Sequence, residues 1–105
     1  MRKKLYHKLV RDRIPESIDR VDKEYQASQL HADDLVRYAL KKLREEVQEF
    51  VEDPCAEEAA DILEILHFIC ERVAIPWTEV EAERISKRIM KGGFETGILL
   101  EWVED

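Results

Sequence analysis

The feature that most constrains this chain is a stretch of twenty residues, 45–64, which carries nine acidic side chains and no basic one. Like charges three or four positions apart destabilise a helix, and an ordinary exposed helix interleaves lysine or arginine to avoid that cost. The stretch is therefore either a disordered acidic tract or a folded segment with something cationic among its carboxylates.

Apolar side chains recur through the same region with the period of an α-helix. From residue 33 onward they are spaced by four and three positions, at Val36, Leu40, Leu43, Val47, Phe50 and Val51. This spacing places one apolar stripe along a helix over about 33–52. The acidic stretch is therefore expected to be folded.

Pro54 separates this helix from a second one. Proline fits the first turn of a helix, and Asp53 in front of it is a good N-cap residue, so the second helix is expected over about 54–73. Its apolar residues cover most of its circumference, which predicts the most buried element of the assembly, covered in part by another subunit. Because the connection is tight, we expect the two helices to lie antiparallel.

Shorter elements are predicted on both sides of this pair. A short helix should start at Pro15 and reach about residue 23, and a third long helix should run from Thr78, in a capping box with Glu81, to about Lys91. The apolar segment 98–103 predicts a short strand that pairs with 3–10. The 105 residues suit one domain, 1–105, an all-α helical bundle built on the antiparallel pair with short terminal β-strands.

Two pairs of carboxylates are expected to meet near the connection. Glu46 and Glu49 lie three residues apart on the first long helix, as do Glu58 and Asp61 on the second. At 100° per residue, Glu58 falls about 40° from Ile62, on the apolar face of its helix. A buried carboxylate must be neutralised, paired or placed on a metal, and oxygen-only ligands suit Mg²⁺ first and Mn²⁺ second.

The alternative is a solvated acidic face, since glutamate-rich helices are common. That reading is preferred for the other acidic residues, which are Glu45, Glu52, Glu57 and Glu64. Among them, Glu45 and Glu64 are candidates for contacts with the metal ligands without binding the metal themselves. His67 is expected to be a packed or interface residue, because no second histidine or cysteine stands at ligand spacing.

The N-terminal segment supplies the opposite charge. Residues 1–23 carry eight basic and four acidic side chains, and Lys8, Arg11 and Arg13 lie close together just before a predicted helix start. Guanidinium groups and helix N-termini favour phosphate oxygens. The alternative is a surface turn whose arginines pair with Asp12 or Glu16, but a divalent metal nearby favours a polyphosphate substrate.

Charge and hydropathy exclude several classes of function. The net charge of −7 argues against binding nucleic acid polymers. No apolar run approaches the length of a membrane span, and no signal peptide follows the basic start, so we expect a cytoplasmic protein that does not bind membranes. Cys55 and Cys70 lie too far apart on one helix for a disulfide and lack metal-ligand spacing.

The pattern of Glu46-x-x-Glu49 followed by Glu58-x-x-Asp61 resembles the signature of the all-α nucleoside triphosphate pyrophosphatases, the superfamily of MazG, dimeric dUTPases and phosphoribosyl-ATP pyrophosphohydrolase. The block from Lys8 to Pro15, and Lys91-Gly-Gly-Phe with Gly-Ile after it, are similar to a small subfamily of house-cleaning pyrophosphatases. Only eight residues separate the two acidic pairs, a shorter spacer than many members of the superfamily have.

This resemblance implies an enzyme, a hydrolase that uses Mg²⁺ to cleave the bond between the α and β phosphates of a non-standard or damaged nucleoside triphosphate. It also implies a homodimer or homotetramer. Metal ligands would be Glu46, Glu49, Glu58 and Asp61, with Glu49 or Glu46 activating the water, while the phosphates would be held by Lys8, Arg11, Arg13 and Lys91. Two alternatives are a phosphoribosyl-ATP pyrophosphohydrolase of histidine biosynthesis and a non-catalytic helical module whose acidic face docks a basic partner.

Overall fold

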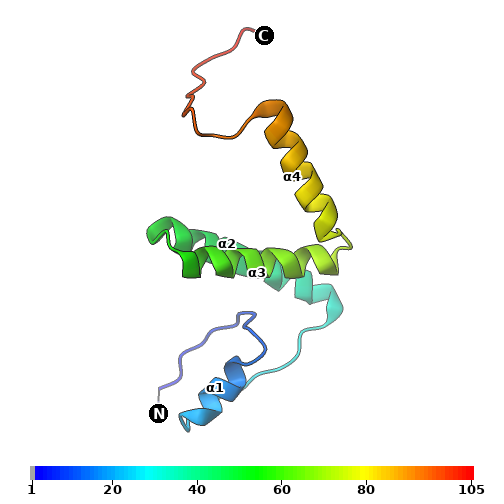
Figure 1. The fold of residues 1–105 in the computed structure, drawn as a ribbon. Helices are drawn as coiled ribbons and strands as arrows, with labels where there is room; N and C mark the ends of the chain where they lie inside the picture. The colour runs from blue at the N-terminus through cyan, green and yellow to red at the C-terminus, as the bar shows by residue number, and fades with distance from the viewer. Residues whose placement is uncertain (1) are drawn as a thin grey trace. The chain divides into compact units, whose positions relative to one another are not determined.

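The computed structural model describes residues 2–105 and is all-helical over that range, which confirms the predicted fold class (Figure 1). Its helices are α1 (Ile14–Arg20), α2 (Ala32–Glu52), α3 (Ala56–Arg72) and α4 (Trp77–Lys91). The chain divides into two compact units, Met1–Ala74 and Ile75–Asp105, which are described separately. None of the helices in the described residues is long and apolar enough to cross a membrane.

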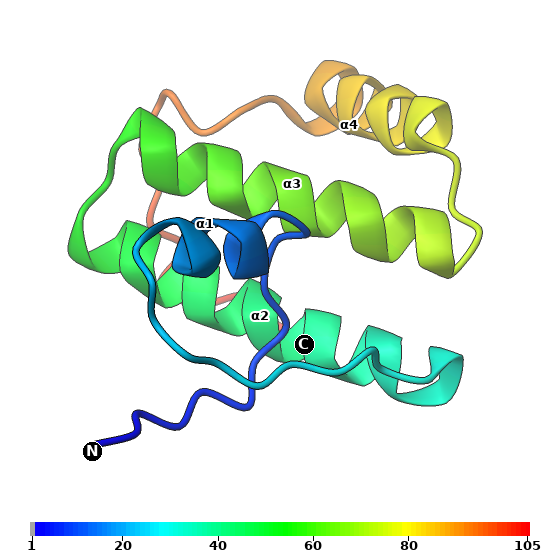
Figure 2. The same ribbon diagram turned by 90° about the horizontal axis from the view of Figure 1, so that it is seen from below.

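Helices α2 and α3 form the predicted antiparallel pair and lie side by side in both ribbon views (Figures 1 and 2). Their buried residues are Ala39 and Glu46 on α2, and Ile69 and Cys70 on α3. Ala39 is fully buried, and its small side chain allows α2 and α3 to approach closely. Glu46 is the exception to an apolar core.

The connection between α2 and α3 differs from its prediction. The backbone N–H of Asp53 donates to the Glu49 carbonyl oxygen at 3.0 Å, so this residue ends α2 and is not the N-cap of α3. Cys55, in an extended conformation, is the N-cap instead, and its side chain makes no capping hydrogen bond. Pro54 consequently lies between the helices and not in the first turn of α3.

Helix α3 buries no more residues than α2 within a single chain. Ala59 and Ala60 are exposed, and Leu63 is 50% exposed. One apolar side of α3 is thus uncovered in the isolated chain. The expectation that another subunit covers it remains a prediction.

The N-terminal segment 2–13 has no regular structure and leads into α1. Pro15 lies in the first turn of α1, as predicted, because its missing N–H is not needed there. The helix ends at Arg20, three residues before its predicted end, and Asp22 adopts a φ of 54° just beyond it. The left-handed conformation stops the helix from continuing.

The second unit consists of α4 and the segment that follows it. Thr78 lies inside α4, because the N-cap position is taken by Pro76, so the predicted capping box is wrong. Gly92, with a φ of 82°, ends the helix, and its backbone N–H donates to the Arg88 carbonyl oxygen.

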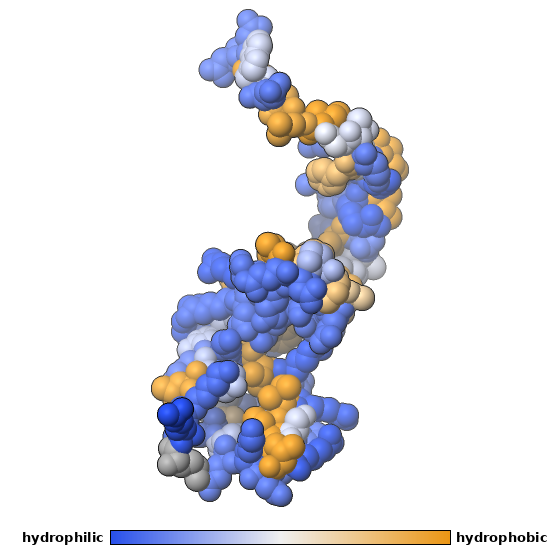
Figure 3. Space-filling model, turned by 90° about the vertical axis from the view of Figure 1, so that its left-hand side faces the viewer, coloured by the Kyte–Doolittle hydropathy of each residue, from blue (hydrophilic) through white to orange (hydrophobic). Residues whose placement is uncertain are grey.

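The predicted strand 98–103 is also wrong. Neither it nor its expected partner 3–10 is a strand in the structure, because a strand requires a hydrogen-bonded ladder that neither segment forms. The apolar side chains of this segment are at least 71% exposed; they are Ile98, Leu99, Leu100, Trp102 and Val103. Orange surface over the second unit in Figure 3 marks this exposed apolar character.

Candidate metal centre

Three carboxylates from the helix pair converge on one point. Glu46 on α2, and Glu58 and Asp61 on α3, each offer an oxygen, and these oxygens all lie within 4.8 Å of one another. The spacing of three residues puts Glu58 and Asp61 on one side of the first turns of α3, and the antiparallel packing brings Glu46 opposite them. We call these three residues the carboxylate cluster.

Two oxygens of the cluster are buried without a hydrogen-bond partner, namely Glu46 Oε2 and Glu58 Oε2. Buried polar atoms nearly always have a partner, and a buried carboxylate oxygen without one costs free energy. A cation bound between the helices would provide that partner. Mg²⁺ takes oxygen ligands and keeps several positions for water and substrate phosphates, so three carboxylates suit it well.

Burial changes the chemistry of Glu46, which is only 6% exposed. Loss of hydration raises the pKa of its carboxyl group, the hydrogen bond from Lys42 lowers it, and the negative charge of Glu49 raises it further. The net effect is a raised pKa. Lys42 thus compensates the charge of Glu46 only in part.

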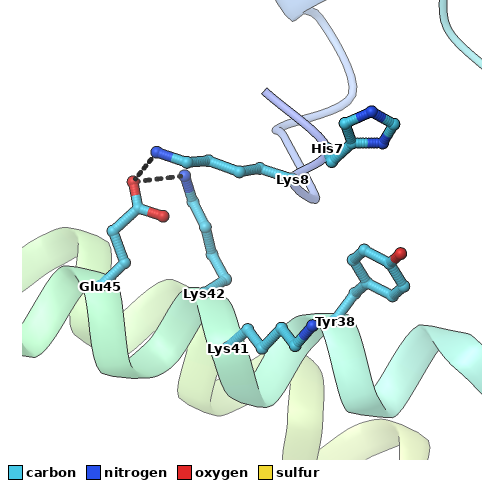
Figure 4. Close-up of a pocket in the computed structure, with 6 residues that line it drawn as sticks. All are labelled: His7, Lys8, Tyr38, Lys41, Lys42 and Glu45. Carbon is cyan, nitrogen blue, oxygen red and sulfur yellow. Dashed lines mark hydrogen bonds and ion pairs between the residues drawn. The ribbon is translucent and has the colours of Figure 1, made fainter. Parts of the chain in front are cut away.

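Cationic side chains reach the cluster from two directions. Lys42 Nζ lies 3.3 Å from Glu46 Oε1, and Arg11 Nη2 lies 2.7 Å from Asp61 Oδ1. Lys8 Nζ lies 3.0 Å from Glu45 Oε1, which Lys42 also approaches, at 3.8 Å (Figure 4). The basic N-terminal segment therefore lies on the acidic helix pair.

The ion pair of Arg11 differs from the one that the surface-turn reading of the basic segment predicts. Arg11 pairs with Asp61, fifty residues away, and the pairing of Glu16 is with Arg20 within α1. The alternative of a turn whose arginines pair with Asp12 or Glu16 is thus not what the structure contains. A phosphate-binding role for the segment remains a prediction.

A groove of about 490 Å³ runs between the N-terminal segment and the helix pair. Residues from Leu9 to Arg13 form one wall, while Lys42, Glu46 and Asp61 lie on the other. Ile65 and Phe68 add an apolar part. The groove has the volume of a typical small-molecule site and combines both signs of charge.

The other predicted residues lie around the cluster at differing distances. Glu49 is outside the three-carboxylate group, although its charge acts on the pKa of Glu46. Glu64 lines the groove, and Glu45 is ion-paired instead of merely solvated. Glu52 and Glu57 are exposed, as expected. Lys91 lies at the end of α4 in the second unit, so its substrate role remains a prediction.

Lys42 belongs to the site, although the spacing of the carboxylates did not predict it. It stands just before the acidic stretch, and its position four residues before Glu46 is the spacing at which oppositely charged side chains meet on a helix. Cys55 and Cys70 are free thiols.

Comparisons of the chain with protein-family models, with curated proteins and with solved structures found no match. What the site can do therefore follows from the residues that it brings together.

Proposed function

We propose that the protein is a Mg²⁺-dependent nucleotide pyrophosphohydrolase, with Mn²⁺ as a substitute, which cleaves a non-standard or damaged nucleoside triphosphate to a monophosphate and pyrophosphate. The observation that carries this proposal is the pair of buried, unpartnered oxygens of Glu46 and Glu58 inside a cluster of three carboxylates. A cation among them would remove an unfavourable arrangement, and the adjoining groove supplies cationic side chains for phosphates.

The carboxylates divide the work in this proposal. Glu46, Glu58 and Asp61 hold the metal, which when bound polarises the phosphoryl group and acidifies a coordinated water. Glu49 is favoured over Glu46 as the proton acceptor, because Glu46 belongs to the carboxylate cluster whereas Glu49 lies outside it. Glu49 is still close enough for its charge to raise the pKa of Glu46. The water oxygen bonds to one of the two phosphorus atoms of the α–β bridge and gives its proton to Glu49. The bond between that phosphorus and the bridging oxygen breaks, its electron pair stays on the bridging oxygen, and the products leave as the nucleoside monophosphate and pyrophosphate.

The basic side chains hold the substrate. Arg11 and Arg13 line the groove, and their guanidinium forks match phosphate oxygens. Arg11 must exchange Asp61 for a phosphate when the metal takes over the negative charge of that carboxylate. Formation of the productive site thus couples metal binding to phosphate binding.

A homodimer or homotetramer in the cytoplasm is part of the same proposal. Its support is the apolar surface that a single chain leaves open, on α3 at Leu63 and through the second unit from Ile89 to Val103. Exposed apolar patches of this kind mark interaction sites.

The decisive experiment offers the purified protein a panel of normal and damaged nucleoside triphosphates, with phosphoribosyl-ATP included, and measures pyrophosphate release. Release should require Mg²⁺ or Mn²⁺, and Glu58→Gln should abolish it without unfolding the helices. Glu57→Gln, an exposed neighbour on the same turn, is the matched control and should remain active. Retained activity in Glu58→Gln would rule out its role as a ligand.

The non-catalytic alternative predicts a different result. A helical module that docks a basic partner should release no pyrophosphate, and Mg²⁺ should not change its thermal stability. A metal that binds only the folded state raises the melting temperature as its concentration rises. A Mg²⁺ titration of the melting temperature therefore separates the two readings before any substrate is known.

A further inference from the structure

A second, smaller pocket of about 190 Å³ opens beside the groove, between the N-terminal segment and α2 (Figure 4). Its lining residues, which define what we call the lysine pocket, are His7, Lys8, Tyr38, Lys41, Lys42 and Glu45. Three lysines and one glutamate thus line the pocket, and the ammonium groups of Lys8 and Lys42 approach the Glu45 carboxylate. The charge balance is opposite to that of the carboxylate cluster.

The arrangement of Lys8 and Lys42 resembles the coordination of an anion. Both ammonium groups point at the same atom, Glu45 Oε1, at 3.0 and 3.8 Å (Figure 4). The hydrogen bond with Glu45 raises the pKa of Lys8. A phosphate oxygen in the place of the Glu45 oxygen would receive the charge-assisted hydrogen bond of Lys8 and would lie within ion-pair distance of Lys42.

Lys42 joins the lysine pocket to the carboxylate cluster. It lines both the pocket and the groove, and its ammonium group lies 3.3 Å from Glu46 Oε1. A linear chain of phosphates that starts at the cluster therefore reaches Lys42 next and Lys8 after it. Single phosphates do not need such a row of sites.

The backbone at His7 adds an independent observation. This residue has a φ of 45°, in the left-handed region that non-glycine residues rarely occupy. Backbone conformations of this kind cost free energy and concentrate at functional sites. At His7 the conformation directly precedes Lys8, on the wall of the pocket.

Tyr38 argues against a pocket for the nucleobase. The guanidinium carbon of Arg37 lies 4.8 Å from the centre of its ring, and Lys41 Nζ lies 5.2 Å from it. Cations already occupy the ring, whereas base stacking needs an open aromatic face. The pocket is better suited to an anion.

We propose that the lysine pocket is the subsite for the two terminal phosphates of the substrate, and for the pyrophosphate product, with Lys42 and Lys8 as the residues that bind them. The assignment rests on the proposed function and deepens it. Lys42 would give up its contact with Glu46 when that carboxylate holds a metal, and its ammonium group would then be available for the β phosphate.

The test is the binding of inorganic pyrophosphate, orthophosphate and a nucleoside monophosphate, measured by calorimetry in the presence of Mg²⁺. Lys42→Met and Lys8→Met should each weaken pyrophosphate binding about tenfold or more, as expected for the loss of a hydrogen bond to a charged group. Monophosphate binding should stay unchanged. Lys42→Arg should restore much of the affinity, and Lys23→Met, an exposed lysine outside both pockets, should bind pyrophosphate like the wild type.

A separate readout excludes a purely structural role of Lys42. Because Lys42 competes with a metal for Glu46, Lys42→Met should bind Mg²⁺ as tightly as the wild type or more tightly. Weaker Mg²⁺ binding in this variant would show that Lys42 supports the cluster and would overturn the assignment. If Lys42→Met does not fold, Lys8→Met and Lys42→Arg decide.

The outcomes separate the subsite from the proposed function. Loss of pyrophosphate binding in both variants, with a wild type that cleaves no nucleotide, supports the subsite and contradicts the enzyme. An active wild type whose Lys8 and Lys42 variants bind pyrophosphate normally contradicts the subsite alone. Equal affinity of the wild type for orthophosphate and pyrophosphate would also overturn it, because two adjacent phosphate positions should favour the longer anion.

Discussion

Glu46, on α2, is a carboxylate that has lost nearly all contact with water, whereas Trp102, in the second unit, is an apolar side chain that is 82% exposed. Each arrangement is unfavourable for the isolated chain, the first because a charge is desolvated and the second because apolar surface remains in water. Each would be relieved by a different partner. A cation suits the first region, and another apolar surface suits the second.

The second region should show the greater effect, because many apolar side chains contribute there. In the proposed homo-oligomer, Ile98→Glu combined with Trp102→Glu should weaken subunit association at least about a hundredfold, since each buried side chain contributes roughly 1.5–3 kcal/mol. Sedimentation over a range of protein concentrations measures this change. Glu104→Gln, in the same segment, is the control for altered charge. A wild type that is monomeric at every concentration would refute the interpretation of this surface.

For the first region, removal of a charge should stabilise the protein when no metal is present. Glu58→Leu is expected to raise the free energy of unfolding in a chelator by roughly 1–2 kcal/mol, because a buried oxygen without a partner is eliminated. In Mg²⁺ the order should reverse, since only the wild type gains stability from binding. Denaturant unfolding with and without metal measures both values.

The matched variant for this comparison is Glu57→Leu, because Glu57 is exposed on the same turn of α3. It should change stability little and should leave the response to Mg²⁺ intact. A Glu58→Leu variant that is less stable than the wild type in chelator would mean that the buried oxygen has a favourable partner.

The parts of this site that the sequence predicted depend on residues only three or four positions apart. The 3.6-residue period defined α2, and pairs three residues apart placed Glu58 and Asp61 together. The pairing of Lys8 with Glu45 and of Arg11 with Asp61 spans 37 and 50 residues. No local period encodes contacts of that length, so charge segregation could indicate only that the two regions attract each other.

The errors have a common physical origin in the neighbours of each segment. Asp53 has the side chain of an N-cap, but its backbone N–H is already used by the last turn of α2. Residues 98–103 have strand propensity, but a strand also requires a partner. Local preference indicates which conformation a residue favours, but it does not tell whether the neighbouring chain leaves room or provides a partner for that conformation.

Acidity should affect the two regions in opposite directions. Burial raises the pKa of Glu46, so its folded state binds a proton more tightly than the unfolded state, and its contribution to stability falls as pH rises above about 4.5. Backbone hydrogen bonds and Arg88 lower the pKa of Glu95, so its contribution is present at higher pH and is lost as pH falls below about 4.5.

Melting temperatures between pH 3 and 7 in chelator test this difference. The melting temperature of Glu46→Gln should exceed that of the wild type by the largest amount near neutral pH. The melting temperature of Glu95→Gln should lie below that of the wild type near neutral pH, and this difference should disappear on acidification. Identical pH profiles for the two variants would contradict the contrast in their surroundings.

The smallest effect concerns the N-cap positions of α3 and α4, where neither side chain makes a capping hydrogen bond to the helix backbone. Cys55→Ser should stabilise the protein by about 0.5 kcal/mol, because Cys55 already has the extended backbone of a cap and a hydroxyl can accept from a free N–H. Pro76→Ser should gain less stability, since it also removes the restriction that proline places on the unfolded chain.

Cys55→Asp separates the effect of capping from the effect of charge. Its carboxylate would face the acidic residues of the same turn, and Mg²⁺ bound at the cluster should reduce that repulsion. An aspartate that outperforms serine in chelator would show that the start of α3 does not carry the excess negative charge on which the metal site depends.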